Sequence, residues 1–182
     1  MIDPRSIKDY LPIEGKITRL GVFTRENITD AYLAWLNNPA VTQYSNQRFR
    51  RHTLQTSLDY LETFNNSENL FLAVLSKGDE EFIGTMTVFL SSVHETADMG
   101  IMIGDTRYWG KGIGSDAWLT MLTFLLDKVK VRKATGGTLG CNLSMQRIML
   151  KSGMKPDGTR IAQELVDHHV QDILYFAKFC GA

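Results

Sequence analysis

Apolar residues along the chain follow two spacings, and together these predict a mixed α/β fold. Within 113–129, for example, Ile113, Ala117, Met121 and Leu125 lie on one stripe, which is typical of a helix packed on a sheet. Helical spacing of this kind predicts helices over 26–38, 52–66, 113–129 and 143–153. Apolar and β-branched runs predict strands over 16–24, 69–77, 81–93, 96–105, 132–140, 154–165 and 168–179. This order favours a mixed sheet over a doubly wound one, because three consecutive strands precede a single β-α-β unit.

The composition is that of an ordinary globular protein, and it argues against several classes of function. The 182 residues are 43% hydrophobic and 22% charged, without internal repeats or linkers, so we expect one domain over 1–182. Twenty basic residues balance twenty acidic ones, which argues against binding to nucleic acid or to a membrane surface. We find no signal peptide at the N-terminus and no apolar run of membrane-spanning length. The chain has two cysteines and no CxxC pair, which predicts a cytoplasmic protein without disulfides. The histidines lack metal-ligand spacing, so we expect no bound metal.

The segment 107–118, RYWGKGIGSDAW, places three glycines directly before an apolar helix. The first N–H groups of a helix are unpaired and favour an anion, and glycine lets a phosphate approach the backbone closely. A P-loop is excluded, because Lys111 is not followed by Ser or Thr. Gly112, Gly114 and Ala117 match a GxGxxA dinucleotide fingerprint, but the residues about 20 positions later contain no acid to bind the ribose. The third candidate ligand is the pyrophosphate of coenzyme A.

Two features resemble the GNAT acyltransferase superfamily. Arg107-x-x-Gly110-x-Gly112 resembles the R/Q-x-x-G-x-G/A signature, whose backbone N–H groups bind the CoA pyrophosphate in that family. The preceding strand, 99–105, resembles the splayed strand that pairs with the pantetheine arm in the same family.

Three further segments extend the resemblance over nearly the whole chain, in the family's order. Residues 142–154 resemble the second CoA element, with Met145 and Met154 where Ser and Phe are usual. The segments 32–44 and 171–179 resemble the branch that includes the ribosomal-protein N-terminal (Rim-type) acetyltransferases.

The resemblance implies an α/β (α+β) GNAT-like fold with a mixed, mostly antiparallel sheet of about seven strands flanked by about four helices. It implies acetyl-CoA as cofactor. The residues expected to bind it are Ile101, Met102, Ile103, Arg107, Gly110, Lys111, Gly112, Ile113, Gly114, Ser115, Asn142, Arg147 and Lys151. From the sequence alone, Asn142 is also explained as a plain helix N-cap, and Arg107 and Lys111 as solvated side chains.

Acetyl transfer to an amine needs a proton acceptor for the amine and a donor for the oxyanion. Asp98 is the first candidate for the base, followed by Glu95 and His94, because relatives often use a carboxylate on or near this strand. The alternative is that all three are solvated turn residues. The family implies that a backbone N–H within 101–103 stabilises the oxyanion.

The leaving thiolate has no obvious proton donor. Met149 stands where many relatives carry a Tyr, so Ser144 and Tyr175 are the remaining candidates, and a thiolate of this kind can leave without a dedicated acid. Cys141 raises a covalent route, but a buried, inert cysteine is the simpler explanation.

For the acceptor, the family's pocket points to Trp35, Asn37, Tyr44 and Arg48. The loop 46–52 contains three arginines, which are either solvated or recognise an acidic acceptor. We therefore expect an N-acetyltransferase that moves an acetyl group from acetyl-CoA to a primary amine, on a small molecule such as an amino sugar or on a protein N-terminus, by direct attack in a ternary complex. A non-catalytic CoA-binding module and an NAD(P)-dependent oxidoreductase are the alternatives. The resemblance leaves a homodimer open.

Overall fold

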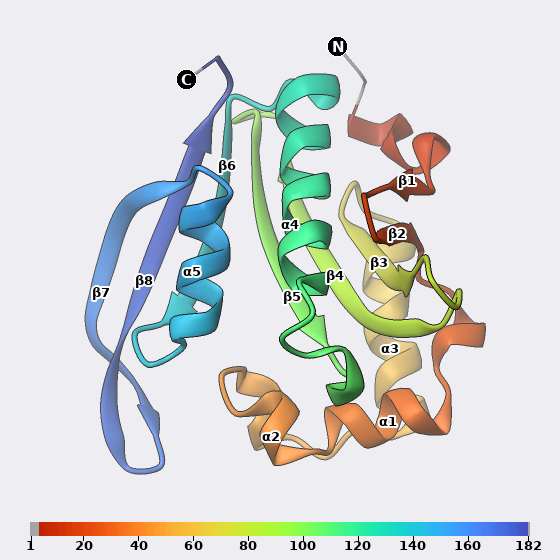
Figure 1. The fold of residues 1–182 in the computed structure, drawn as a ribbon, viewed down its shortest axis with the longest axis vertical. Coiled ribbons are helices and arrows are strands. Elements are labelled where there is room, and N and C mark those ends of the chain that lie inside the picture. Colours follow the sequence, from red (N-terminus) through yellow and green to blue (C-terminus); the bar gives the residue numbers. More distant parts are fainter. Residues whose placement is uncertain (1–3, 182) are drawn as a thin grey trace.

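An eight-stranded sheet forms the centre of the protein (Figure 1). The computed structural model describes residues 4–181, so residues 1–3 and 182 of the expected domain lie outside the described part. The strands are Ile13–Glu14 (β1), Thr18–Val22 (β2), Leu70–Ser76 (β3), Phe82–Ser91 (β4), Thr96–Ile103 (β5), Lys133–Leu139 (β6), Lys155–Val166 (β7) and His169–Phe179 (β8). Their order across the sheet is β1-β2-β3-β4-β5-β6-β8-β7, and only β5 and β6 are parallel. The predicted mixed, mostly antiparallel sheet is confirmed, with the short edge strand β1 in addition.

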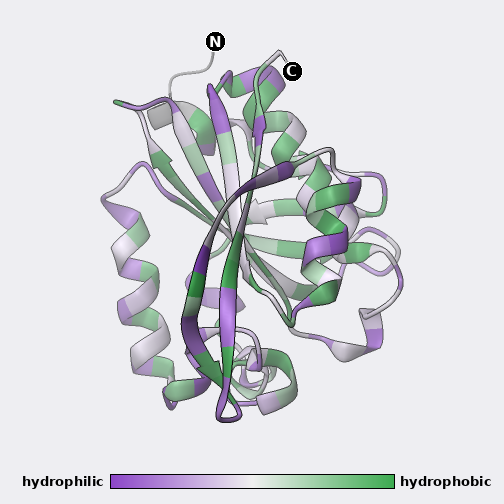
Figure 2. Cartoon of the chain, turned by 90° about the vertical axis from the view of Figure 1, so that its left-hand side faces the viewer, coloured by the Kyte–Doolittle hydropathy of each residue, from purple (hydrophilic) through white to green (hydrophobic). Residues whose placement is uncertain are grey.

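Helices cover both faces of this sheet. The α-helices are Asp30–Leu36 (α1), Pro39–Thr42 (α2), Leu54–Asn65 (α3), Ile113–Phe124 (α4) and Leu143–Lys151 (α5). Figures 1 and 2 show α3 on one face and α4 with α5 on the other, while α1 and α2 lie at the end of the sheet away from the termini. The helix expected over 26–38 begins only at Asp30, because the Thr29 side chain accepts the Tyr32 N–H (3.2 Å) and caps it. No helix within residues 4–181 is long and apolar enough to cross a membrane.

Two apolar clusters fill the spaces between the helices and the sheet. On the α4 side, Ala117, Met121 and Leu125 of the predicted stripe are fully buried in the apolar cluster. On the α3 side the cluster is aromatic, and Phe71 stacks between Phe23 (4.2 Å between ring centroids) and Phe64 (5.1 Å). These clusters fix the two faces on which the site is built.

The sheet opens between β5 and β6. These strands pair only over Thr96–Asp98 and Lys133–Thr135. Beyond that, β5 stays paired with β4 up to Ile103 and β6 stays paired with β8 up to Leu139. The strands therefore diverge toward the end of the sheet where α1 and α2 lie (Figure 1), which leaves one edge of β5 without a partner strand.

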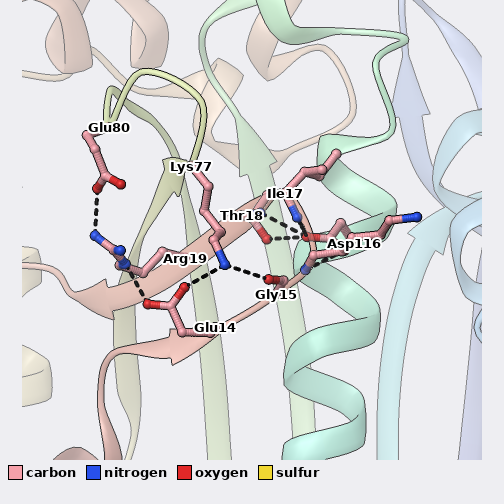
Figure 3. Close-up of polar contacts among 9 residues, drawn as sticks. Glu14, Gly15, Ile17, Thr18, Arg19, Lys77, Glu80 and Asp116 are labelled. Atoms are coloured by element: carbon pink, nitrogen blue, oxygen red, sulfur yellow. Dashed lines mark hydrogen bonds and ion pairs between the residues drawn. The ribbon is translucent and has the colours of Figure 1, made fainter.

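The N-terminal strands are tied to the first turn of α4 by one carboxylate (Figure 3). Asp116 accepts hydrogen bonds from the backbone N–H groups of Lys16 (3.1 Å), Ile17 (2.9 Å) and Thr18 (2.9 Å). The Thr18 hydroxyl donates a fourth (2.8 Å). A side chain at Gly15 would place its Cβ 2.5 Å from the same carboxylate, so the turn requires glycine there. This contact joins segments that lie about a hundred residues apart.

Candidate active site

A cavity of about 1070 Å³ opens where β5 and β6 diverge. One side is formed by the end of β5, the start of α4 and the polar end of α5. The other side is formed by α2, the loop that follows it and the first half of α3. One continuous space therefore joins the glycine segment to the segment expected to bind the acceptor.

A row of unpaired backbone N–H groups lines the first side. Gly110 and Gly112 have φ of +73° and +83°, a conformation that L side chains adopt only at a cost. Within the described part of the chain, the N–H groups of residues 110–115 donate no hydrogen bond. Residues 110–112 lie directly before α4 and residues 113–115 form its first turn, where the helix dipole favours an anion. This amide cradle, residues 110–115, fits the pyrophosphate of CoA.

The α5 side of the cavity supplies polar and cationic groups. Asn142, Ser144, Arg147 and Lys151 all line it. Asn142 also caps α5, because its Oδ1 accepts the Met145 N–H (3.2 Å). The interpretation of Asn142 as a helix cap is therefore confirmed, and the residue also lines the cavity.

Arg107 and Lys111 do not line the cavity. The Arg107 guanidinium binds Asp105 (2.6 Å) and Glu81 (2.7 Å), and this hydrogen bonding holds the pKa of Asp105 below its usual value. The Lys111 ammonium lies over the Tyr108 ring, 5.6 Å from its centroid. In this structure the Arg107 guanidinium therefore holds the turn before the cradle and lies outside the cavity lining.

Two aromatic residues of the same turn do line the cavity, and the sequence analysis did not single them out. The Tyr108 hydroxyl donates to Asp79, and this hydrogen bond raises the pKa of Tyr108 to about 12. The Trp109 indole N–H donates to the carbonyl of Ile103 (2.8 Å). Both groups are already paired, so they shape the wall and do not offer a free proton. Only their position inside the glycine segment could have indicated them.

The three expected bases lie outside the cavity lining. Asp98 is on β5, where its carboxylate accepts the Thr135 hydroxyl (2.6 Å), and it is exposed. His94 and Glu95 lie in the β4–β5 turn, at the end of β5 opposite the cavity. There the Glu95 carbonyl accepts the Arg132 N–H (2.7 Å).

Of the two expected acids, Ser144 lines the cavity and Tyr175 does not. Tyr175 lies on β8 opposite Gly137, with Arg160 over its ring at 5.4 Å. Met149, in the place of the family's usual Tyr, is fully buried. Cys141 is not part of the lining either.

The structure separates the four residues expected to bind the acceptor. Tyr44 lines the cavity, whereas Trp35 covers Gly104, where a Cβ would lie 2.3 Å from the indole. Asn37 and Arg48 instead hold the loop of residues 46–52 in place. Further lining residues that the sequence analysis did not name as site candidates include Tyr32, His52, Ser57, Tyr60, Thr85 and Thr87.

The acceptor-side loop, residues 46–52, is held at both ends. Asn37 Nδ2 donates to the His52 carbonyl (2.8 Å), and Asn37 Oδ1 accepts the His52 N–H (2.9 Å). Arg48 reaches the β7–β8 hairpin, donating to the Leu165 carbonyl (3.0 Å) and pairing with Glu164 (3.5 Å). The loop is therefore fixed relative to both α1 and the hairpin.

Comparison with known proteins agrees with this geometry. Residues 19–155 match the family model described as an acetyltransferase (GNAT) domain. The chain is 26% identical over 125 residues to the probable N-acetyltransferase YjcK of Bacillus subtilis, covering 64% of this chain and 67% of that protein. An acetyltransferase (GNAT family) from Bacillus anthracis has a similar fold, with a TM-score of 0.80 at 17% identity over 94% of this chain and 100% of that chain. RimL, a ribosomal L7/L12 α-N-protein acetyltransferase in complex with coenzyme A, also has a TM-score of 0.80, at 12% identity over 93% and 97% of the chains.

The chain belongs to the GNAT acetyltransferase family, because the family model matches most of its length. The suspected membership is thereby confirmed, and the fold is shared with Rim-type acetyltransferases. The protein is an acetyl-CoA-dependent acyltransferase, and acetyl-CoA is its cofactor. The alternative of a nucleotide-dependent oxidoreductase is not retained.

Proposed function

We propose that the protein transfers the acetyl group of acetyl-CoA to a primary amine by direct attack in a ternary complex, with the whole chain as one catalytic domain. The supporting observation is the single cavity that joins the amide cradle to a separate acceptor side. Both substrates can then be held at once, as direct attack requires. Since Cys141 lies outside the lining, a covalent acetyl-cysteine route has no support in this geometry.

Bound acetyl-CoA supplies an activated acetyl thioester, and the chain's own groups bind and orient the reactants. The amide cradle would hold the pyrophosphate, with Arg147 and Lys151 supplying positive charge beside it. The unpaired edge of β5 between Met99 and Ile103 offers backbone N–H groups in the cavity, where one can donate to the developing oxyanion.

His52 is our candidate for the proton acceptor. It is the only histidine among the described lining residues, and no Asp or Glu lines the cavity there. Its Nε2 lies 3.1 Å from the Gln47 carbonyl; if Nε2 carries the proton and donates to that carbonyl, Nδ1 is left as an acceptor. Ser144 is the candidate near the leaving sulfur, because it lines the cavity and Tyr175 does not.

Two measurements test this proposal. Acetyl-CoA at about 100 times its Kd should stabilise the purified protein by about 2.7 kcal/mol, which raises the Tm of a chain of this size by roughly 5–10 °C. Thiol release from acetyl-CoA should require an added amine. The cofactor assignment fails if acetyl-CoA leaves the Tm unchanged.

The base assignment is tested by comparing His52→Gln with Asp98→Asn. We expect His52→Gln to lower kcat by about 100-fold, the usual contribution of a general base, while the Tm gain from acetyl-CoA is retained. Asp98→Asn should keep most of the activity, because its carboxylate lies outside the cavity lining. The opposite pattern would return the role to Asp98.

A further inference from the structure

All charged side chains among the described residues that line the cavity are cationic. They are Arg50, Arg51, Arg147 and Lys151, and no Asp or Glu lines the cavity, although the chain as a whole has equal numbers of acidic and basic residues. Arg147 and Lys151 lie on α5, on the cradle side. Arg50 and Arg51 lie between α2 and α3 on the acceptor side, so phosphate binding at the cradle does not account for their charge.

The two acceptor-side arginines extend from a fixed backbone, and their guanidinium groups have no partner in the described part of the chain. Their neighbours in the loop are held by Asn37 and by the β7–β8 hairpin, and the Arg50 N–H donates to the Gln47 carbonyl (3.1 Å). In contrast to Arg48, neither guanidinium forms a hydrogen bond or an ion pair within residues 4–181. A held loop with unpaired guanidinium groups is suited to binding a carboxylate or phosphate, whose geometry matches the guanidinium fork.

A buried hydroxyl on the same side also lacks a partner. Ser57 is 5% exposed and lines the cavity, and its Oγ forms no hydrogen bond in the described part of the chain. A buried polar atom without a partner is costly, and a ligand group that pairs with it removes that cost. The acceptor side therefore offers a hydrogen-bonding position in addition to its charge.

We propose that the acceptor is an amine that also carries a carboxylate or phosphate group, which the guanidinium groups of Arg50 and Arg51 bind. This inference rests on the proposed acetyltransferase function and names the acceptor class for it. An amine is itself a cation before it reacts, so a cavity whose charged lining residues are all cationic disfavours a polyamine or a neutral amino sugar. An anionic group on the acceptor reverses the sign of that interaction, and Ser57 donates to or accepts from a further polar group of the acceptor.

The test uses pairs of acceptors that differ only in the anion. One arm compares glucosamine 6-phosphate with glucosamine, and the other compares a Ser-Asp-Ala-Ala peptide with Ser-Asn-Ala-Ala, so the arms separate a phosphorylated small molecule from an acidic peptide. In at least one arm kcat/KM should be about tenfold higher for the anionic member, which corresponds to one well-formed ionic contact. The preference should fall as salt is added, and spermidine should be a poor acceptor.

Variants link the preference to the two arginines. In Arg50→Gln/Arg51→Gln the ratio of kcat/KM between paired acceptors should fall toward one, and Arg50→Lys/Arg51→Lys should retain part of it. Arg25→Gln removes a charge from an exposed side chain outside the cavity lining and should keep the full ratio. The Tm gain from acetyl-CoA checks that each variant is folded.

The outcomes separate the two proposals. Turnover without an anionic preference in either arm, or a preference that the double Gln variant retains, overturns the inference and leaves the acetyltransferase function standing. Absence of turnover with every amine overturns the proposed function, and the inference with it.

Discussion

Asp116 provides the sharpest test of how the cradle helix is anchored (Figure 3). Its carboxylate accepts three backbone N–H groups and the Thr18 hydroxyl, all within 2.8–3.1 Å. In Asp116→Ala, the N–H groups of Lys16 and Ile17 can turn to water, because both residues are exposed. Thr18 is fully buried, so its N–H and hydroxyl would lose their only strong acceptor.

The magnitude follows from these two unsatisfied groups. Each costs about 1–3 kcal/mol when its partner is removed, so we expect Asp116→Ala to lower the free energy of unfolding by about 2–6 kcal/mol. For a chain of this length, that loss lowers the Tm by roughly 4–24 °C. Asp116→Asn keeps one acceptor oxygen and should cost about half as much.

The assay is thermal unfolding, followed by circular dichroism in the absence of acetyl-CoA. Asp127→Ala is the matched control, because Asp127 is exposed at the far end of the same helical segment and accepts no hydrogen bond from residues 4–181. Its Tm should stay within about 1 °C of the wild type, as for most exposed substitutions. If Asp116→Ala unfolds at the same temperature as Asp127→Ala, the carboxylate does not anchor the helix and the reasoning is refuted.

Three further predictions concern the amide cradle and the segments that hold the cavity in place. Gly112→Ala should weaken acetyl-CoA binding, measured by calorimetry, by about tenfold, because an L residue at φ +83° costs about 1–2 kcal/mol and the cradle would relax. The control is Gly181→Ala, at φ +77° and outside the cavity lining, which should leave this affinity unchanged. Because Arg107 lowers the pKa of Asp105, the ionised pair stabilises the fold above the carboxyl's unfolded pKa of about 4. The stability difference between wild type and Asp105→Asn should therefore be largest above about pH 5 and shrink as the pH falls below about 4 in urea titrations; a difference independent of pH would count against the pair. Arg48→Ala should raise the KM for the acceptor by about three- to tenfold, since it frees the loop from Leu165, while the acetyl-CoA affinity stays the same; equal effects on both substrates would contradict this role.

Local patterns in the sequence predicted most of the fold. The stripe on 113–129 and the alternating strands reflect which faces must leave water, and the burial of Ala117 and Met121 confirms the stripe. The glycine segment predicted an anion site, because unpaired N–H groups at a helix start and positive φ are local properties. The helix start at Asp30 was missed, since the Thr29 cap outweighs the apolar spacing upstream of it.

The side chains of the site were predicted less well, because their directions depend on distant partners. The Arg107 guanidinium pairs with Asp105 of its own turn and with Glu81, which belongs to another segment of the chain, and it lies outside the cavity lining. Asp98 sits on the correct strand but outside the cavity lining, and no sequence spacing reveals where the opening between β5 and β6 begins.

By itself, the sequence determined most of the order of helices and strands, without the short β1 and α2, together with the glycine turn expected to bind phosphate and the resemblance to GNAT enzymes. These rest on burial and backbone conformation within short segments. Only the tertiary structure decided which charges face the cavity. Arg48 pairs with the β7–β8 hairpin, whereas Arg50 and Arg51 line the cavity and form no ion pair within residues 4–181. Contacts between segments more than a hundred residues apart make that distinction.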